Sequence, residues 1–231
     1  MTIKMYDLAA AEDDRRFSPY CWRIKMVLAH KGLKVETIPW RFHEKEAIAF
    51  SGQGLVPVLV DGERVVHDSW EIALTLDEAY PGEPRLFEGH QSKALAFFFK
   101  HWCEQTVHLP IFRATILDLY ANLHAKDREY FRTSRENRFG QTLEQFGADR
   151  EGALKALRTA LGPLRPVLKE QPFVSGRLPA FSDYALFGAF QWARAMSPVQ
   201  LLAGDDPVHA WRERMLDLYG GLARSAKGYP V

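Results

Sequence analysis

Residues 54–70 restrict the fold of this chain more than any other stretch. Two short β-branched runs, residues 58–60 and 65–66, flank Asp61-Gly62, a dipeptide that tolerates the positive φ angles of a tight hairpin turn. The pattern therefore predicts two short strands that pair antiparallel.

A helix is predicted immediately after the second strand. Asp68 and Glu71 have the spacing of a capping box, and apolar residues follow at helical intervals until Pro81-Gly82 ends the helix. A proline also enters the first strand, at Val56-Pro57. Because proline donates no amide hydrogen, this step leaves backbone groups available to another partner. Taken alone, the stretch is typical of an ordinary hairpin and a capped helix.

Composition excludes several classes of protein. The 231 residues are 47% hydrophobic, enough for one large or two small cores. Thirty basic and 29 acidic side chains leave a charge of +1, so no overall field favours nucleic acid or an anionic membrane. With no apolar run of membrane-spanning length and no signal-peptide pattern, we expect a cytoplasmic protein that does not bind a membrane. Cys21 and Cys103 lack metal-ligand spacing, and we expect no metal site.

The first part of the chain has an alternating pattern. A strand is predicted from Ile3 to about Asp7, followed by a helix that Ser18 caps, that Pro19 opens and that Gly32 ends. A second strand is predicted over residues 34–39, and a loop with one helical turn over residues 40–54. With the hairpin and its helix, residues 1–81 have the order β-α-β-(α)-β-β-α, and residues 82–89 have the composition of a linker.

Residues 90–231 are predicted to be almost wholly helical. The expected helices are one kinked at Pro110, one over residues 127–146, one over 151–169 broken near Pro163 and Pro166, and two over 181–196 and 207–219. We expect the tail that follows to be loose.

Several motifs together resemble a known family. Val56-Pro57 followed by Asp68-Ser69 resembles the glutathione-binding core of the glutathione S-transferase superfamily. The glutathione-dependent β-aryl etherases and related fungal transferases are similar over more of the chain, in Ser18-Pro19-Tyr20-Cys21-Trp22-Arg23, Val56-Pro57-Val58, Asp68-Ser69-Trp70, Leu76-Asp77-Glu78-Ala79-Tyr80-Pro81, Leu86-Phe87-Glu88-Gly89, Phe112-Arg113, Ile116-Leu117-Asp118, Asp127-Arg128-Glu129-Tyr130 and Ser134-Arg135-Glu136. The resemblance implies a thioredoxin-like α/β domain joined to an all-α domain, a cis peptide bond at Pro57, glutathione as cosubstrate and a homodimer.

Ser18 is the candidate catalytic residue. A serine before a proline at a helix start is most often only an N-cap. In a transferase its hydroxyl donates a hydrogen bond to the sulfur of glutathione, and the helix N-terminus adds positive potential that favours the thiolate. Backbone amides near Tyr20 are the alternative source of that stabilisation.

Cys21 is the alternative reactive residue. Ser18-Pro19-Tyr20-Cys21 has the spacing of a Cys-x-x-Cys redox site, but serine stands where the attacking thiol would be. We therefore interpret Cys21 as a packed apolar side chain and rank thiol reductase activity low.

The resemblance also implies the glutathione contacts. Val56 presents its backbone to the peptide beside Pro57, Ser69 binds the γ-glutamyl carboxylate at a helix N-terminus, and Asp68 faces the ammonium group. The weaker candidates, for the glycyl end, are Gln53, Trp40 and Arg41, and a plain loop role is an equal alternative for each of them.

A substrate pocket is expected between the two domains. Its aromatic candidates are Tyr20, Phe98, His101, Trp102, Phe112 and Trp192. At helical spacing, most of these side chains are better explained as core residues than as ligand contacts.

Three functions are compatible with these patterns. The first is transfer of glutathione to an aromatic electrophile, with β-aryl ether cleavage among the reactions that the resemblance implies. The others are a non-catalytic binding or dimerisation module and a glutathione-dependent reductase or peroxidase, which needs a reactive cysteine. The chain departs from the family pattern at Ala180, three residues before Asp183. Many family members carry a capping side chain at this position, so we expect a weaker helix start there.

Overall fold

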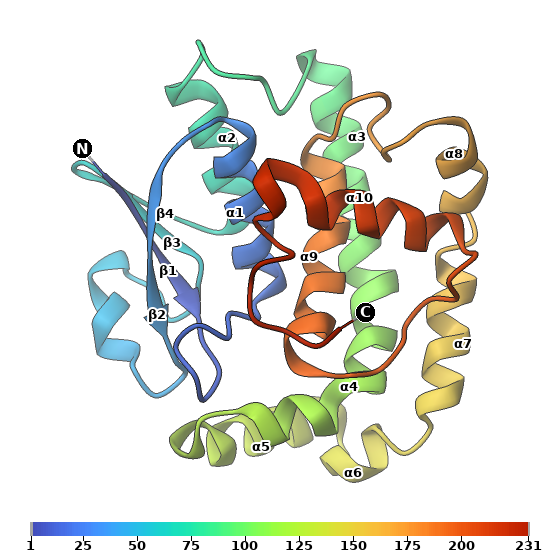
Figure 1. The fold of residues 1–231 in the computed structure, drawn as a ribbon. Helices are drawn as coiled ribbons and strands as arrows, with labels where there is room; N and C mark the ends of the chain where they lie inside the picture. Colours follow the sequence, from blue (N-terminus) through green and yellow to red (C-terminus); the bar gives the residue numbers. More distant parts are fainter. Residues whose placement is uncertain (1, 231) are drawn as a thin grey trace.

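The computed structural model describes residues 2–230, in which a small sheet lies beside a larger group of helices (Figure 1). The four strands have the order β2-β1-β3-β4. β1 and β2 are parallel, whereas β3 pairs antiparallel with both β1 and β4. The bounds are β1 Ile3–Leu8, α1 Pro19–His30, β2 Val35–Trp40, the 3₁₀-helix Lys45–Ser51, β3 Val58–Asp61, β4 Arg64–His67 and α2 Ser69–Ala79.

The predicted strands, hairpin turn and helix starts of this domain are confirmed, and the predicted capping box is present in part. Val60 pairs with Val65 across the hairpin, and Gly62 takes a φ of 63° in the turn. Asp68 caps α2, although the cap has only one half, because no hydrogen bond from the Asp68 amide to the Glu71 carboxylate occurs among residues 2–230. The predicted thioredoxin-like sheet with a helical domain beside it is the observed fold.

Helices form the rest of the described chain. They are α3 Gly89–Trp102, the π-helix Cys103–Val107, α4 His108–Asn122, α5 Ala125–Phe139, α6 Leu143–Phe146, α7 Arg150–Ala160, α8 Leu164–Glu170, α9 Phe181–Met196 and α10 Pro207–Gly221. Every helix within residues 2–230 is too short or too polar to cross a bilayer. The division of the chain at residues 81 and 90 stays a prediction.

A kink was predicted at Pro110, and the structure has an irregular helical turn shortly before this residue. Cys103–Val107 form a π-helical segment between α3 and α4, and Pro110 sits in the first turn of α4. Proline cannot donate to the carbonyl four residues before it, at Thr106, and its ring would clash with that carbonyl. The helix therefore widens in the turn before the proline.

The single helix predicted over residues 127–146 is wrong. Gly140 takes a φ of 67° and ends α5, and Thr142 with Gln145 forms a capping box that starts α6. By contrast, the break between α7 and α8 and the bounds of α9 are confirmed. The last predicted helix, over 207–219, agrees with α10 except that Leu218, Tyr219 and Gly220 are not helical in their backbone angles.

The start of α9 is stabilised by hydrogen bonds to the side chain of Asp183, in place of a capping side chain at Ala180. The Ala180 methyl group offers no acceptor, as expected, but the buried Asp183 carboxylate accepts from the amides of Ala180 and Val174 and from the indole of Trp211 at 2.8–3.2 Å. The helix start is thereby fixed to a loop and to α10.

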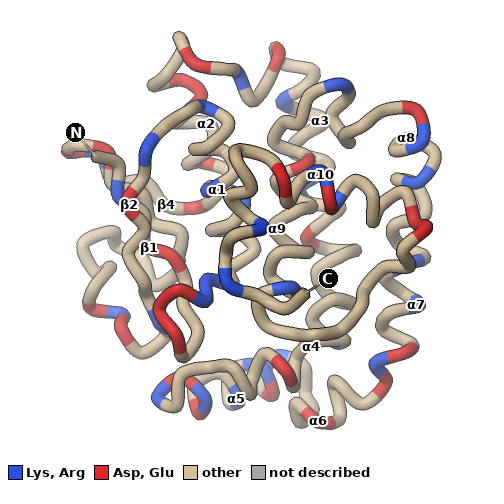
Figure 2. The backbone as a smooth tube through the Cα atoms, in the orientation of Figure 1, with Lys and Arg blue, Asp and Glu red and all other residues tan. Residues whose placement is uncertain are grey.

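The C-terminal tail packs against the first domain, so the prediction of a loose tail is wrong. Lys227 pairs with Glu12 at 2.6 Å and with Asp14 at 3.2 Å. The Tyr229 amide donates to the Arg194 carbonyl at 2.8 Å. Figure 2 shows the acidic loop after β1 beside this basic tail. The tail therefore bridges α9 and the loop that leads to α1.

The two domains meet most closely where α9 packs against α1 (Figure 1). A Cβ atom added to Gly188 would lie 2.2 Å from the carbonyl oxygen of Pro19. Glycine is therefore required at this position of α9, because backbone atoms of Pro19 occupy the space of a side chain.

We predict that Gly188→Ala lowers the free energy of unfolding by about 1 to 3 kcal/mol, because the methyl group separates the two helices. Helix propensity alone predicts the opposite sign, a gain of about 1 kcal/mol from replacing glycine within a helix. Denaturant unfolding measures the change, with Gly82→Ala as control because nothing lies within 4 Å of its added Cβ. A Gly188→Ala protein as stable as the parent would contradict the close approach.

Candidate functional site

A cavity of about 300 Å³ lies where the first domain faces the helical domain. Apolar and aromatic side chains form most of its wall. The lining residues are Leu8, Phe17, Ser18, Pro19, Tyr20, Trp40, Phe42, Leu55, Val56, Glu104, His108, Leu109, Phe112, Leu119, Phe131, Arg135, Arg138, Phe139 and Trp192.

Ser18 lies at the cavity wall, at the N-terminus of α1. It is 3% exposed, and its Oγ accepts from the Cys21 amide at 3.2 Å, which confirms the predicted cap. Because Oγ is the acceptor in this bond, the hydroxyl proton is available to a ligand. The first amides of α1 add positive potential at the same place.

Val56 supplies backbone groups beside Ser18. The Val56-Pro57 peptide bond is cis, as predicted. Val58 pairs with His67, and the ladder ends there, so Val56 lies outside it. Within residues 2–230 no hydrogen bond of the Val56 backbone is found, and Val56 lines the cavity. Its amide and carbonyl can therefore bind a peptide-like ligand.

Asp68 and Ser69 lie at the start of α2, where β4 ends. Asp68 Oδ1 accepts from the amides of Trp70 at 2.8 Å and Glu71 at 3.3 Å, with Asp68 itself at a φ of 64°. Ser69 is 3% exposed, and its Oγ accepts from Arg23 Nη1 at 2.9 Å. Neither residue lines the cavity, and their predicted roles toward glutathione stay predictions.

Arg23 was not among the predicted site residues, yet it connects three elements. Its guanidinium is fully buried and donates to Ser69 on α2 and to Glu104 in the π-helical segment, both at 2.9 Å. Burial acts to raise the pKa of Glu104, but Arg23 and Lys100 beside it outweigh that effect and hold the pKa below its usual value. The only sequence signal for Arg23 was a cation, with Lys25 two residues later, among the apolar residues of a helix start.

The three weaker candidates are placed differently. Trp40 is buried and lines the cavity, and its indole donates to the Glu44 carbonyl at 2.8 Å. Arg41 binds the Ala10 carbonyl at 2.9 Å and pairs with Asp13. Gln53 turns back onto the backbone of Leu55. Arg41 and Gln53 thus have local partners.

The structure brings only some of the predicted aromatic residues together. Phe112 and Trp192 stack at 5.4 Å in the cavity wall, and Tyr20 lies nearby against His108 at 5.7 Å. Phe98 is 68% exposed on α3, so it lies neither in a core nor in the cavity wall. His101 and Trp102 are also outside the lining.

Sequence reasoning missed the side chains that α5 and the start of α4 contribute. Arg135, Arg138 and Phe139 come from α5, which is too polar overall to suggest a cavity wall. His108 is 9% exposed, and burial, with the nearby charge of Arg23, lowers its pKa to about 4. Its Nε2 has no hydrogen-bond partner within residues 2–230.

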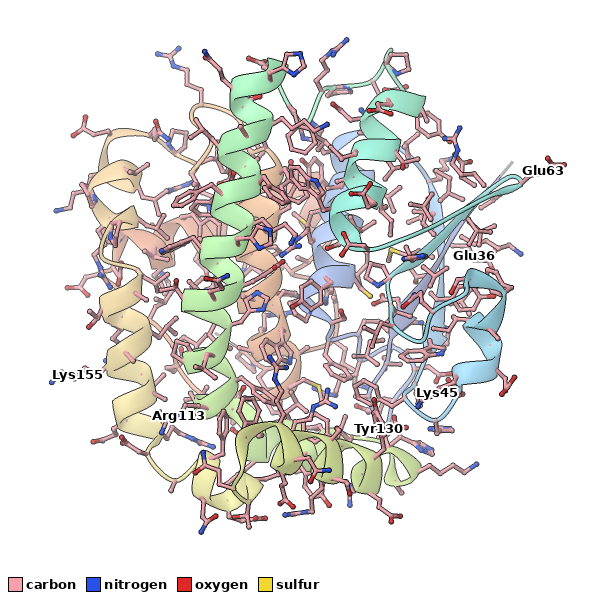
Figure 3. The ribbon with its side chains drawn as sticks, turned by 180° about the vertical axis from the view of Figure 1, so that it is seen from behind. Glu36, Lys45, Glu63, Arg113, Tyr130 and Lys155 are labelled. Carbon is pink, nitrogen blue, oxygen red and sulfur yellow. The ribbon has the colours of Figure 1, made fainter. Side chains whose placement is uncertain are left out.

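Contacts with the first domain fix the position of α5. Lys45 lies over the ring of Tyr130 at 4.9 Å, and Figure 3 shows these two labelled residues on neighbouring elements. The buried Asp127 carboxylate accepts from the backbone amide of His43 at 2.9 Å. The α5 side chains therefore stay beside the 3₁₀-helix and its loop.

The two cysteines are unsuited to redox chemistry. Both are fully buried and free. Burial raises the pKa of Cys103 to about 12, and burial together with the charge of Asp7 raises the pKa of Cys21 further. Neither thiol ionises appreciably at neutral pH.

Comparison with protein families identifies both halves of the chain. The family model "Glutathione S-transferase, C-terminal domain" matches residues 94–212, and "Glutathione S-transferase, N-terminal domain" matches residues 14–84.

Individual relatives agree with this result. Glutathione S-transferase Z1 of Arabidopsis thaliana is 39% identical over 69 residues, which are 28% of this chain and 31% of that protein. The match thus spans about a third of this curated relative. A probable glutathione S-transferase of Oryza sativa, GSTU6, is 26% identical over 85% of this chain and 80% of its own length.

A solved structure shows the same fold over nearly the whole chain. The glutathione transferase GSTFuA3 of Phanerochaete chrysosporium superposes with a TM-score of 0.77 at 28% identity, covering 97% of this chain and 94% of that one. A transferase of Ceriporiopsis subvermispora, solved in complex with glutathione, has a TM-score of 0.80 at 21% identity, covering 95% and 96%.

We predict that neither cysteine reacts with 5,5′-dithiobis(2-nitrobenzoate) in the folded protein, because both are buried and their pKa values are raised. Raising the pH from 7 to 9 should not start the reaction, although it would ionise an ordinary thiol with a pKa of about 8.5. Absorbance at equal protein concentration, with and without guanidinium chloride, measures the labelling. Rapid reaction of Cys21 in the native protein would instead support reductase chemistry.

Proposed function

The chain belongs to the glutathione S-transferase family, and we propose that it joins the thiol of glutathione to an apolar, aromatic electrophile. The observation that carries this proposal is the position of Ser18. Within residues 2–230 its hydroxyl accepts from Cys21 and donates to no other group, and it lies at a helix N-terminus. It shares the cavity wall with Val56, whose backbone makes no hydrogen bond within the same residues. A thiol bound along Val56 would meet both groups.

Glutathione would bind as an extended peptide. The backbone of Val56 pairs with its cysteinyl residue, and the α2 N-terminus at Ser69 binds the γ-glutamyl carboxylate. Arg23 holds the Ser69 hydroxyl in place and adds positive charge behind it. Asp68 faces the ammonium group, and Gln53, Trp40 and Arg41 lie toward the glycyl end.

The reaction would be a nucleophilic displacement. The glutathione thiol loses its proton to solvent, and the Ser18 hydroxyl donates a hydrogen bond to the thiolate. The thiolate attacks an electrophilic carbon held against the aromatic wall, a C–S bond forms, and the leaving group departs with its electron pair. Holding the two reactants in one cavity supplies the orientation. An aryl ether carbon, with phenolate as the leaving group, is one such centre.

The rival functions have less support. A reductase or peroxidase requires an accessible thiol, and both cysteines are fully buried. A binding module has no need for a serine with a free hydroxyl proton at a cavity that opens beside unpaired backbone groups.

A homodimer is part of this proposal. Leu95 and Phe98 are 69% and 68% exposed, and they stand one helical turn apart on α3. Large apolar side chains adjacent on one helix face favour association with a second copy.

We predict that Ser18→Ala raises the pKa of the bound glutathione thiol and lowers turnover at neutral pH, because the thiolate loses a hydrogen bond. Affinity for glutathione changes little, since the hydroxyl contacts only the sulfur. Thiolate absorbance against pH, calorimetry with glutathione and turnover of 1-chloro-2,4-dinitrobenzene measure the three quantities.

The controls separate this effect from the loss of the cap, which costs about 1 kcal/mol of stability. Each variant is first shown to be folded. Ser92→Ala removes a serine from the first turn of α3, outside the cavity. If Ser18→Ala titrates and turns over like the parent, backbone amides near Tyr20 stabilise the thiolate instead.

We predict that Leu95→Glu combined with Phe98→Glu converts a dimer into a monomer, because four buried like charges would oppose each other across a two-fold interface. Sedimentation velocity measures the mass. Leu178→Glu is the matched control, since Leu178 is 76% exposed outside α3. A parent protein that sediments as a monomer would refute the homodimer.

A further inference from the structure

Two arginines in the cavity wall have no use in the glutathione chemistry described above. Arg135 and Arg138 both come from α5 and line the cavity beside the aromatic side chains. No aspartate or glutamate carboxylate lies within 4.0 Å of either guanidinium anywhere in residues 2–230, whereas Arg132 on the same helix pairs with Glu136 and Glu144 at 2.9 and 2.8 Å. Carboxylates are therefore available around α5, but they pair with Arg132 and not with the cavity arginines.

Arg135 is partly buried among aromatic rings, without a carboxylate partner in residues 2–230. Its guanidinium lies over the rings of Phe131 at 4.4 Å and Phe42 at 5.3 Å and donates to the hydroxyl of Ser134 at 2.6 Å, with the hydroxyl of Tyr130 as a further neighbour. Burial lowers its pKa, Tyr130 partly opposes this shift, and the charge of Arg138 adds to it. An anion in the cavity would offset both effects, because it supplies the opposite charge and the missing acceptors.

The charges along the cavity wall leave it positive. Glu104 is the one carboxylate among the lining residues, and Arg23 and Lys100 pair with it at 2.9 and 3.0 Å. His108 is neutral at pH 7 because its pKa is about 4. The two α5 arginines are thus the uncompensated charges of this wall.

The rest of the wall fits a flat ring. Phe112 stacks on Trp192 at 5.4 Å and meets Phe139 at 5.9 Å. The volume of about 300 Å³ is at the lower end for small-molecule sites. The unpartnered Nε2 of His108 offers one further polar contact within the same cavity.

We propose that the preferred electrophile is an aromatic carboxylate, whose ring lies against Phe112 and Trp192 and whose anionic group binds Arg135 with Arg138 beside it. This inference rests on the proposed transferase function and specifies its substrate class. A guanidinium binds a carboxylate through two parallel hydrogen bonds, so the pair also fixes the direction of the ring relative to the thiolate.

The first test compares two electrophiles that differ in one charge, 4-chloro-3,5-dinitrobenzoate and its methyl ester. In each reaction the thiolate forms a C–S bond, the C–Cl bond breaks, chloride leaves with the electron pair and the thiol proton passes to solvent. Each kcat/KM is divided by the uncatalysed rate constant with glutathione, which removes the difference in intrinsic reactivity. We expect the parent protein to favour the carboxylate.

The variants locate the preference. Arg135→Met should lower the normalised kcat/KM of the carboxylate by about 10- to 100-fold, the range for a charge-assisted hydrogen bond, and change that of the ester by less than about threefold. Arg135→Lys should restore part of the loss. Arg138→Met changes an exposed residue and therefore tests the same charge with little effect on packing. Arg128→Met is the matched control, because Arg128 is on α5 outside the cavity lining.

A binding experiment separates failure of this inference from failure of the proposed function. Calorimetry compares S-(4-carboxybenzyl)glutathione with S-benzylglutathione, and needs no turnover. Tighter binding of the carboxylate, lost in Arg135→Met and Arg138→Met, supports the inference. Equal binding of both compounds overturns the substrate class and leaves the transferase function intact. If neither compound binds, the proposed function and this inference both fail.

Discussion

The missing side chain of Gly188 allows α9 to lie directly against the backbone of Pro19, and the geometry of the cavity depends on this contact. Ser18 is the residue that precedes Pro19, at the N-terminus of α1. Trp192 lies one helical turn after Gly188 on α9 and lines the same cavity. A single close approach between backbones therefore sets the distance between the proposed thiolate and the aromatic wall. Side chains farther along either helix cannot correct an error there, because packed interiors leave no free volume to absorb a shift.

Buried ion pairs extend this arrangement in three directions from α1. Arg23 pairs with Glu104 of the helical domain, Lys25 with Asp7 at the end of β1, and Lys31 with Asp77 of α2. Each cation is 9% exposed or less. Such pairs add little net stability compared with apolar residues of the same volume, but loss of one partner typically costs about 3 to 5 kcal/mol. Their contribution is thus to specify one orientation of α1 against the sheet, α2 and the helical domain.

The features that could be predicted from sequence are those whose causes lie within a few residues. The cap at Ser18, the hairpin turn at Gly62 and the cap at Asp68 are local, and all are observed. Arg23 meets Ser69 and Glu104 across 46 and 81 residues, so no spacing rule could indicate its role. The same holds for the α5 side chains, which reach the cavity only because distant contacts hold that helix beside the first domain. Gly140 is the opposite case. A glycine is a local sign of a helix end, but it was overlooked because the surrounding residues were predicted to form one long polar helix.

The C-terminal tail contacts the loop that leads to Ser18 and helix α9 through two different kinds of interaction. Lys227 holds Glu12 and Asp14 through side chains that are 34% to 70% exposed, whereas the bond from Tyr229 to Arg194 involves only backbone atoms. Dissolved ions screen exposed charge pairs and leave backbone hydrogen bonds almost unaffected. Ionic strength therefore weakens the Lys227 pairs selectively, while the tail remains on α9. The loop that leads to Ser18 then depends on Arg15, which lies over the Tyr229 ring at 5.3 Å and donates to the Ala195 carbonyl of α9 at 2.6 Å. Arg15 thus becomes the residue that carries the contact between this loop and the last helices when the exposed pairs are screened.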